Sequence, residues 1–125
     1  MSTTRLHPGQ SAELSFEVTR ELSVNRMGRV GAEVLSTPSL LELMERTCNA
    51  ASDPYLPKGH TTVGYAVDGL RHIAPTPIGH TVRVRAELTE VNRDRLTYRI
   101  EAFEGDKRIG VATHKRAVIA TGAGP

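Results

Sequence analysis

Aromatic side chains and cysteine are scarce in this chain of 125 residues, which contains no Trp, three Tyr, two Phe and a single cysteine, Cys48. One cysteine excludes an internal disulfide framework and points to a reducing compartment. The few aromatic side chains offer no stacking platform for single-stranded nucleic acid. The net charge is only +2 and the basic residues are scattered, so nucleic acid is not expected as a partner, whereas a modestly basic site for an anionic ligand is compatible.

Long apolar runs and metal-binding patterns are missing as well. No segment approaches the roughly 18 apolar residues that span a membrane, and Met1 to Arg5 lead into no apolar run, so we expect neither a membrane partner nor a signal peptide. No two of the five histidines have metal-site spacing, and Cys48 has no thiolate partner. These absences predict a cytoplasmic protein without a metal site.

The predicted elements are one strand, one helix and four further strands. Alternation predicts strands at 12–19, 61–70, 81–91, 96–102 and 108–120, and a period near 3.6 predicts a helix at 38–52. Because each element hides only one face, a single antiparallel sheet must cover the helix. This predicts the α+β class and the hot-dog architecture, a long helix wrapped by a curved five-stranded sheet. We expect one domain, 1–125, with its core at about 10–120 and a disordered tail at 121–125.

The predicted sheet has one strand that invites a partner. The last three strands follow one another through short turns and predict a meander. The second strand carries Val63, Tyr65 and Val67 on one face. We expect this strand to be an exposed edge at which a second subunit can pair.

The helix opens at Thr37, the expected N-cap, followed by Pro38 in the first helical position. The predicted buried face comprises Leu40, Leu41, Met44, Thr47, Cys48 and Ala51, and the predicted solvent face comprises Glu42, Arg46 and Asn49. Glu45 lies at the border between the two faces. It is either a solvated boundary residue or a general base or nucleophile in a partly apolar pocket.

Thr37 also has two interpretations. It is a cap, or it supplies a hydroxyl donor or nucleophile at a helix N-terminus, where positive potential favours developing negative charge. Eight helical residues separate Thr37 from Glu45 by about 12 Å. A direct hydrogen bond between them is therefore not expected, and a third group, a substrate or a second subunit must join them.

Three other positions could carry chemistry. His72 follows the second strand and is either a structural or surface residue or a base or donor near pH 7. Gly64 interrupts the same strand, which marks a bulge, a close approach to the helix, or a backbone N–H that polarises a carbonyl. In Thr113-His114-Lys115-Arg116, alternation places Lys115 or Arg116 on the inner face, where a charge needs a partner or a ligand.

The order and spacing of several short motifs are more specific than any one of them. They are Thr37-Pro38, Glu45, Pro54-Tyr55-Leu56, Val63-Gly64, His72-Ile73-Ala74-Pro75-Thr76-Pro77, Gly79-His80-Thr81-Val82, Gly110 and Thr113-His114-Lys115-Arg116-Ala117-Val118-Ile119. Together they resemble the fluoroacetyl-CoA thioesterase family of hot-dog proteins over about residues 10–120.

The resemblance implies roles for five residues. Thr37, Glu45 and His72 match the catalytic threonine, glutamate and histidine of the family, Gly64 matches the glycine whose backbone holds the thioester carbonyl, and Arg116 matches an arginine near the acyl or CoA end. It also implies a homodimer with sites at the subunit interface and no metal or organic cofactor. The fluoroacetyl-specific member has an aromatic lid residue shortly before the threonine, and 25–36 contains no aromatic here. A different short acyl group is therefore expected.

The function expected from these residues is hydrolysis of a short-chain acyl-CoA, with Gly64 and Thr37 polarising the carbonyl, Glu45 activating water or attacking directly, and His72 moving the proton. The sequence leaves both routes for Glu45 open. The alternative is a non-catalytic hot-dog module that binds acyl-CoA as a sensor, because fold alone does not fix function. A hydratase or dehydratase on this fold has no matching motif here.

Overall fold

The computed structural model describes residues 5–28 and 31–122 and contains one long helix and five strands. The strands are β1 (Ser11–Glu17), β2 (His60–His72), β3 (Thr81–Asn92), β4 (Arg95–Glu104) and β5 (Lys107–Ala120), and the helix is α1 (Thr37–Ser52). Short 3-10 turns occupy Arg20–Leu22, Val24–Met27 and Asp53–Tyr55. The predicted order of elements is confirmed. The end of the predicted tail, 123–125, lies outside the described residues.

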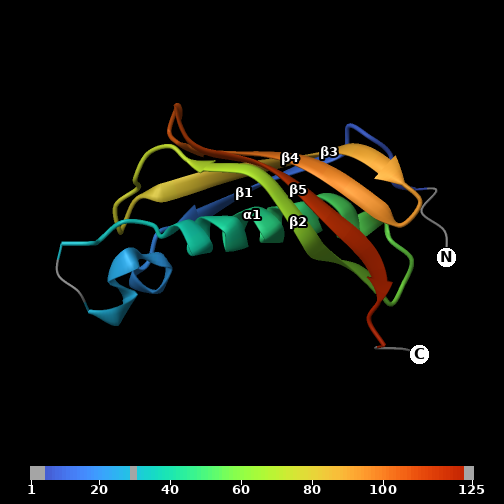
Figure 1. Cartoon of the computed structure of the whole chain (residues 1–125), viewed down its shortest axis with the longest axis horizontal. Coiled ribbons are helices and arrows are strands. Elements are labelled where there is room, and N and C mark those ends of the chain that lie inside the picture. The colour runs from blue at the N-terminus through green and yellow to red at the C-terminus, as the bar shows by residue number, and fades with distance from the viewer. Residues whose placement is uncertain (1–4, 29–30, 123–125) are drawn as a thin grey trace.

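The five strands form one antiparallel sheet in the order β1-β3-β4-β5-β2. Figure 1 shows this sheet curving over α1, so that the helix lies along its concave face. Strands β3, β4 and β5 form the predicted meander, while β1 and β2 occupy the two edges. The arrangement confirms the expected helix wrapped by a sheet.

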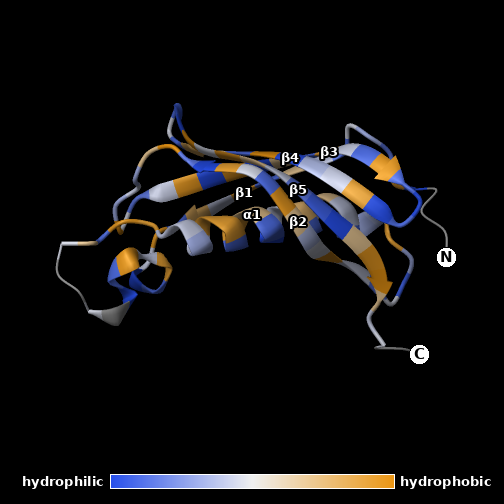
Figure 2. Cartoon of the chain, in the orientation of Figure 1, coloured by the Kyte–Doolittle hydropathy of each residue, from blue (hydrophilic) through white to orange (hydrophobic). Residues whose placement is uncertain are grey.

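The core lies between the concave face of the sheet and one side of α1. Inward positions of β3 and β4 alternate with exposed ones, as Figure 2 shows by the alternation of hydropathy along the strands. The largest buried apolar side chains are Tyr98, Leu35, Leu40, Leu43, Met44, Leu88, Leu96, Ile100 and Ile109. Within the described part of the chain, no helix is long and apolar enough to cross a membrane.

The helix differs from its predicted form at three positions. Ser36, not Thr37, is the N-cap: its side chain accepts a hydrogen bond from Ser39 N at 3.2 Å. Leu43 is fully buried, whereas Leu41 is only half-buried, because the sheet covers the helix slightly to one side of the predicted stripe. Asn49, expected in water, accepts hydrogen bonds from two other elements, as described below.

Strand β2 is an edge strand, as predicted, with hydrogen-bonded pairing only to β5. Val63, Tyr65 and Val67 are exposed, Tyr65 at 52%. The pairing of β2 with β5 shifts register between Gly64 and Ala66, so Gly64 does mark a bulge. This irregular, apolar edge runs past the middle of α1, and it determines what surrounds Glu45.

Candidate active site

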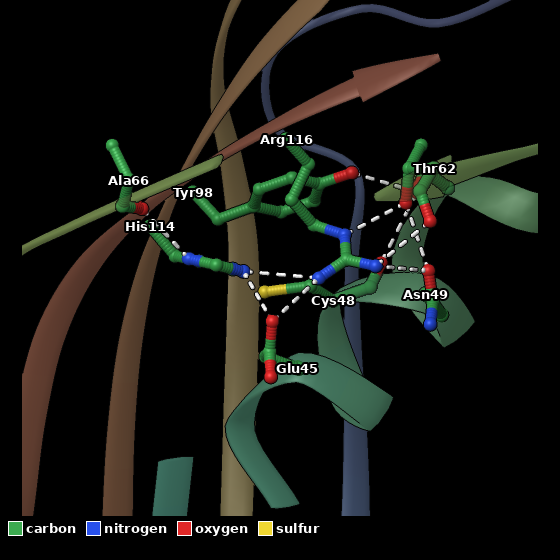
Figure 3. A network of polar contacts seen from close by, with 9 residues as sticks. Glu45, Cys48, Asn49, Thr62, Ala66, Tyr98, His114 and Arg116 are labelled. Atoms are coloured by element: carbon green, nitrogen blue, oxygen red, sulfur yellow. Dashed lines mark hydrogen bonds and ion pairs between the residues drawn. The ribbon is translucent and has the colours of Figure 1, made fainter. Parts of the chain in front are cut away.

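Glu45 projects from the middle of α1 toward β5 and β2. Its Oε2 lies 3.4 Å from Arg116 Nη1 and 3.4 Å from His114 Nε2 (Figure 3). The Glu45 side chain is nevertheless 39% exposed. One carboxylate oxygen therefore faces fixed polar groups from β5, while the side chain as a whole keeps access to solvent.

Of Lys115 and Arg116, between which the alternation of the last strand did not decide, Arg116 faces inward and is only 4% exposed. Its Nε donates to Thr62 Oγ1 at 2.7 Å, and Nη2 donates to Thr62 O at 2.9 Å and Asn49 Oδ1 at 3.0 Å. Its Nη1 faces Glu45 and His114. All five N–H groups of the guanidinium thus have partners within the chain, as a buried cation requires.

His114 is buried between α1 and the sheet, with 1% of its side chain exposed. Its Nδ1 lies 2.9 Å from Ala66 O, and its Nε2 lies 3.0 Å from Arg116 Nη1. Burial lowers the pKa of His114 below its ordinary value, reinforced by the positive charge of Arg116 and opposed by the bond to Ala66 O and by Glu45. The imidazole is therefore neutral at neutral pH.

Gly64 allows β2 to approach this cluster closely. A Cβ built at Gly64 would lie 2.7 Å from both Glu45 Oε2 and His114 Cε1. Real Cβ atoms do not tolerate such distances, so any side chain here displaces the carboxylate or the buried ring. The close approach expected at this glycine is present, and Glu45 is the group it accommodates.

Thr37 and His72 form a second, separate polar pair at the N-terminal end of α1. Thr37 Oγ1 lies 2.8 Å from His72 Nδ1. Because the side chain of Ser36 caps the helix, the Thr37 hydroxyl does not have to cap it and is available to hydrogen-bond with His72. Burial lowers the pKa of His72, and its Nε2 is buried without a hydrogen-bond partner among the described residues.

A cleft of about 300 Å³ lies beside this pair. Thr37 and His72 contribute to its wall, and the remaining lining is apolar, from Val24, Val34, Leu35, Ile73, Ala74 and Pro75. A small apolar group can lie in this cleft with a hydroxyl and an imidazole next to it. The volume is at the lower end of that typical for small-molecule pockets.

The five residues singled out from the sequence therefore separate into two groups. Glu45, Gly64 and Arg116 meet in one cluster, and Thr37 and His72 meet in another. No hydrogen bond in the described part of the chain joins Glu45 to either member of the second pair. Sequence reasoning assigned no role to His114, Asn49 and Thr62, although the alternation that places Arg116 inward places His114 inward as well.

The chemistry available at these clusters is that of carboxylate, imidazole and hydroxyl groups. Burial raises the pKa of the Cys48 thiol to about 12, so no thiolate nucleophile is available near neutral pH. Among the described residues, no group of His, Cys, Asp and Glu side chains could hold a metal ion. A partly exposed carboxylate and a neutral histidine are suited to general-base catalysis or to nucleophilic attack.

Comparisons with known proteins identify relatives of this chain. The family model for fluoroacetyl-CoA-specific thioesterase matches residues 18–122. A fluoroacetyl-CoA thioesterase from Streptantibioticus cattleyicolor is 45% identical over 87 residues, which cover 70% of this chain and 62% of that protein. A solved structure of the fluoroacetyl-CoA thioesterase FlK has a TM-score of 0.84 at 34% identity and covers 93% of this chain and 90% of its own.

A more distant structure supports the fold alone. A hot-dog-like protein from Thermanaerovibrio acidaminovorans has a TM-score of 0.84 at 21% identity, covering 95% of this chain and 87% of its own. The predicted hot-dog fold is confirmed. The family model spans most of the chain, as the resemblance in the sequence predicted, although the aligned region covers less than two thirds of the curated relative. The chain therefore belongs to the fluoroacetyl-CoA-specific thioesterase family.

Proposed function

We propose that this protein hydrolyses short-chain acyl-CoA thioesters to a carboxylic acid and CoA. The observation that carries the proposal is the state of Glu45, whose Oε2 faces Arg116 and the glycine backbone of β2 while the side chain remains 39% exposed. A carboxylate held in this way is positioned but still accessible to water and substrate. Membership of a thioesterase family supports the choice of a thioester as substrate.

The backbone of Gly64 is a suitable donor to the thioester carbonyl. Val118 N donates to Asp94 O at 2.8 Å, on the side of β5 opposite to β2. Because backbone donors along a strand alternate in direction, Arg116 N–H points to that side too. Gly64 pairs with Arg116, so its own N–H points away from β5, toward the unpaired edge. A donor aimed at developing oxyanion charge stabilises the transition state.

In the proposed reaction, Glu45 takes a proton from a water molecule whose oxygen attacks the acyl carbon, or its own oxygen attacks and forms an anhydride that water then cleaves. In both routes the C–S bond breaks and CoA leaves as thiolate. His72 accepts the proton that the hydrolytic water loses, from Glu45 in the first route or from that water directly in the second, and passes it to the thiolate, assisted by the Thr37 hydroxyl 2.8 Å from its Nδ1. The lowered pKa of His72 keeps its imidazole neutral and able to accept that proton first.

The separation of the two clusters supports a site shared between two copies of the chain. About 12 Å of helix rise lies between Thr37 and Glu45, and the exposed edge of β2 next to Glu45 carries Val63, Tyr65 and Val67. Pairing of two β2 edges about a two-fold axis would cover these side chains and bring the Thr37–His72 pair of one copy toward Glu45 of the other.

Mixing two inactive variants tests the shared site. Glu45→Ala and His72→Ala each remove one half of every site in a pure dimer. After subunit exchange, a mixed dimer regains one intact site if sites are shared, so about a quarter of wild-type activity should return in an equimolar mixture. No recovery after verified exchange, or a clean monomer in sedimentation at micromolar concentration, would contradict the shared site.

The acyl group we propose is short and aliphatic. Aliphatic side chains line the cleft beside His72, and no aromatic lies in 25–36. Solved relatives include complexes with fluoroacetate and CoA and with acetyl-CoA. Without an aromatic lid before Thr37, we expect fluoroacetyl-CoA to have no large advantage over acetyl- or propionyl-CoA.

Release of free thiol from a panel of acyl-CoAs with two to six acyl carbons tests the whole proposal. Turnover of a short member, lost in Glu45→Ala, supports hydrolysis. Saturable binding by calorimetry without thiol release would replace the enzyme by an acyl-CoA sensor. A strong preference for fluoroacetyl-CoA over acetyl-CoA would overturn the proposed acyl specificity while leaving hydrolysis intact.

A further inference from the structure

His114 contacts Glu45 and Arg116, but the proposed mechanism gives His114 no role. It is almost completely buried, and among the described residues its ring nitrogens contact Glu45, Arg116 and the backbone of Ala66. Figure 3 shows the ring lying between Ala66 on β2 and the guanidinium of Arg116, directly above Glu45.

The partners of His114 determine its tautomer. Ala66 O can only accept, so His114 Nδ1 carries the hydrogen and donates at 2.9 Å. The neutral ring then has a lone pair at Nε2, and this nitrogen accepts from Arg116 Nη1 at 3.0 Å. The other hydrogen of Nη1 is directed to Glu45 Oε2 at 3.4 Å. One guanidinium nitrogen is therefore shared between an imidazole and a carboxylate.

This sharing is needed because Nε2 of neutral His114 and Oε2 of Glu45 are two acceptors only 3.4 Å apart. They repel unless a donor lies between them, and Arg116 Nη1 provides it. The contact keeps Oε2 in place on the side facing β5. The second carboxylate oxygen, Oε1, has no hydrogen-bond partner among the described residues and remains for water or substrate.

We propose that His114 is a positioning residue for Glu45: as the Nδ1–H tautomer it orients Arg116 Nη1, which in turn holds one oxygen of the carboxylate and leaves the other free to react. The inference rests on the proposed hydrolysis. His114 touches no substrate in this proposal and acts only through Arg116 and Glu45.

The proposal also makes His114 the point at which acid disables the site. Protonated Nε2 becomes a donor, releases Arg116 Nη1 and binds Glu45 Oε2 itself, which removes basicity from the carboxylate. The titratable groups around the ring are Glu45 and Cys48 on α1, Tyr98 on β4 and Arg116 on β5. Burial raises the pKa values of Cys48 and Tyr98 to about 12, so neither side chain is ionised near neutral pH.

Nitrogen NMR of the wild-type protein tests the tautomer without any measurement of activity. At pH 7.5 we expect a protonated Nδ1 and an unprotonated Nε2 for His114. A protonated Nε2 at this pH would overturn the proposal, because that nitrogen could not accept from Arg116. In the same experiment, His114→Gln should move the carboxyl carbon resonance of Glu45 but leave that of Glu42, which is exposed on the same helix.

Kinetics of two variants separate positioning from packing. His114→Leu fills the space but loses both bonds, and we expect kcat to fall roughly 10- to 10²-fold with little change in KM, as for a misplaced catalytic group. His114→Gln keeps one donor and one acceptor, so it should recover most of this loss while shifting the acidic limb of the pH–rate profile. His7→Gln, at an exposed histidine, is the matched control.

Failure of the positioning role of His114 can be distinguished from failure of the proposed hydrolysis. Full kcat in a folded His114→Leu, or an unchanged acidic limb in His114→Gln, would overturn the positioning role even if hydrolysis is real. If wild type hydrolyses no acyl-CoA in the panel, the proposed function fails, and the Glu45 resonance in His114→Gln then decides whether His114 positions this carboxylate. If the leucine variant does not fold, the glutamine variant and the wild-type tautomer carry the test.

Discussion

The two polar clusters on α1 differ in how completely the fold determines them. Around Glu45, Arg116 makes contacts to α1, β2 and β5, and every N–H of the guanidinium has a partner. At the helix N-terminus, Thr37 and His72 share one hydrogen bond and stand beside an open cleft. One cluster is a buried network with a single accessible group. The other is a pair joined by one bond, in which Thr37 is exposed and His72 is half-buried.

Because of this difference, we expect the two clusters to have different roles in the proposed reaction. A network in which each member has several partners fixes geometry, and removal of one member leaves others unsatisfied inside the protein. A pair joined by one bond can exchange partners with a substrate at small cost. We therefore propose that the buried cluster orients the carboxylate and that the Thr37–His72 pair transfers protons, and the experiments below compare the two clusters.

The largest effect is expected for Glu45, the accessible member of the buried cluster. Glu45→Ala should lower kcat by about 10³-fold, within the range for a positioned acid–base group, with little change in melting temperature because the side chain is partly exposed. Steady-state thiol release and thermal melting measure the two quantities. Glu42→Ala is the control on the same helix, since Glu42 is exposed and pairs only weakly with Arg46 at 4.0 Å. Normal turnover in folded Glu45→Ala would make Glu45 a boundary residue.

A smaller loss of activity is expected at the Thr37–His72 pair. His72→Ala should lower turnover by roughly 10²-fold and remove a limb of the pH–rate profile. Because burial lowers the pKa of His72, that limb should lie below the ordinary histidine value of about 6.5. His80→Ala, at an exposed histidine, should change neither. If rate and profile are unaltered in His72→Ala, the Thr37–His72 pair has no part in proton transfer.

For stability, too, the larger effect is expected in the buried cluster. Arg116→Met leaves buried oxygens of Thr62 without a donor, and we expect the free energy of unfolding to fall by about 2–3 kcal/mol. Denaturant titration measures this change. Lys115→Met, at the neighbouring position on the other face of β5, should change the unfolding free energy by less than about 0.5 kcal/mol. Equal losses for the two variants would mean that the Arg116 network contributes nothing specific.

At the N-terminus of α1, neighbouring residues separate the effect of helix capping on stability from the effect of the Thr37 hydroxyl on turnover. Ser36→Ala removes the observed cap and should cost about 1 kcal/mol of stability with no change in turnover per folded molecule. Thr37→Val should do the opposite and lower turnover without this stability cost, whereas Thr37→Ser should keep most activity. Melting curves and kinetics on the same preparations test the pair. If Thr37→Val lowers stability and Ser36→Ala does not, Thr37 and not Ser36 is the N-cap in solution.

The smallest expected effect is a pH dependence of stability shared by both clusters. Burial lowers the pKa values of His72 and His114, so below about pH 6.5 the unfolded chain binds more protons than the folded one. Their contribution to stability is thus complete above this pH and declines as the pH falls toward the lowered folded values. Melting temperatures between pH 8 and 5 should fall less steeply in His114→Gln than in wild type. Parallel slopes would show that His114 titrates alike in both states.

The local pattern of residues sufficed for the elements, their order and most of the buried face of α1. Alternation in β3, β4 and β5 predicted the meander, the single apolar-faced helix required a covering sheet, and the apolar face of β2 predicted an edge strand. The same alternation predicted that Lys115 or Arg116 faces inward. These features depend on the side-chain periods of a strand, 2 residues, and of a helix, 3.6 residues. Both periods can be read from the spacing of apolar residues along the sequence.

Tertiary structure alone decided which polar groups meet. The competition between Ser36 and Thr37 for the cap depends on backbone angles at the helix entry, and the pattern at Thr37-Pro38 fits both. Asn49 became a partner of Arg116 because the sheet curves around that side of α1. His114 reaches Glu45 because β2 lacks a side chain at Gly64. Contacts of this kind join segments up to 71 residues apart, and short-range periodicity carries no information about distances across the curved sheet.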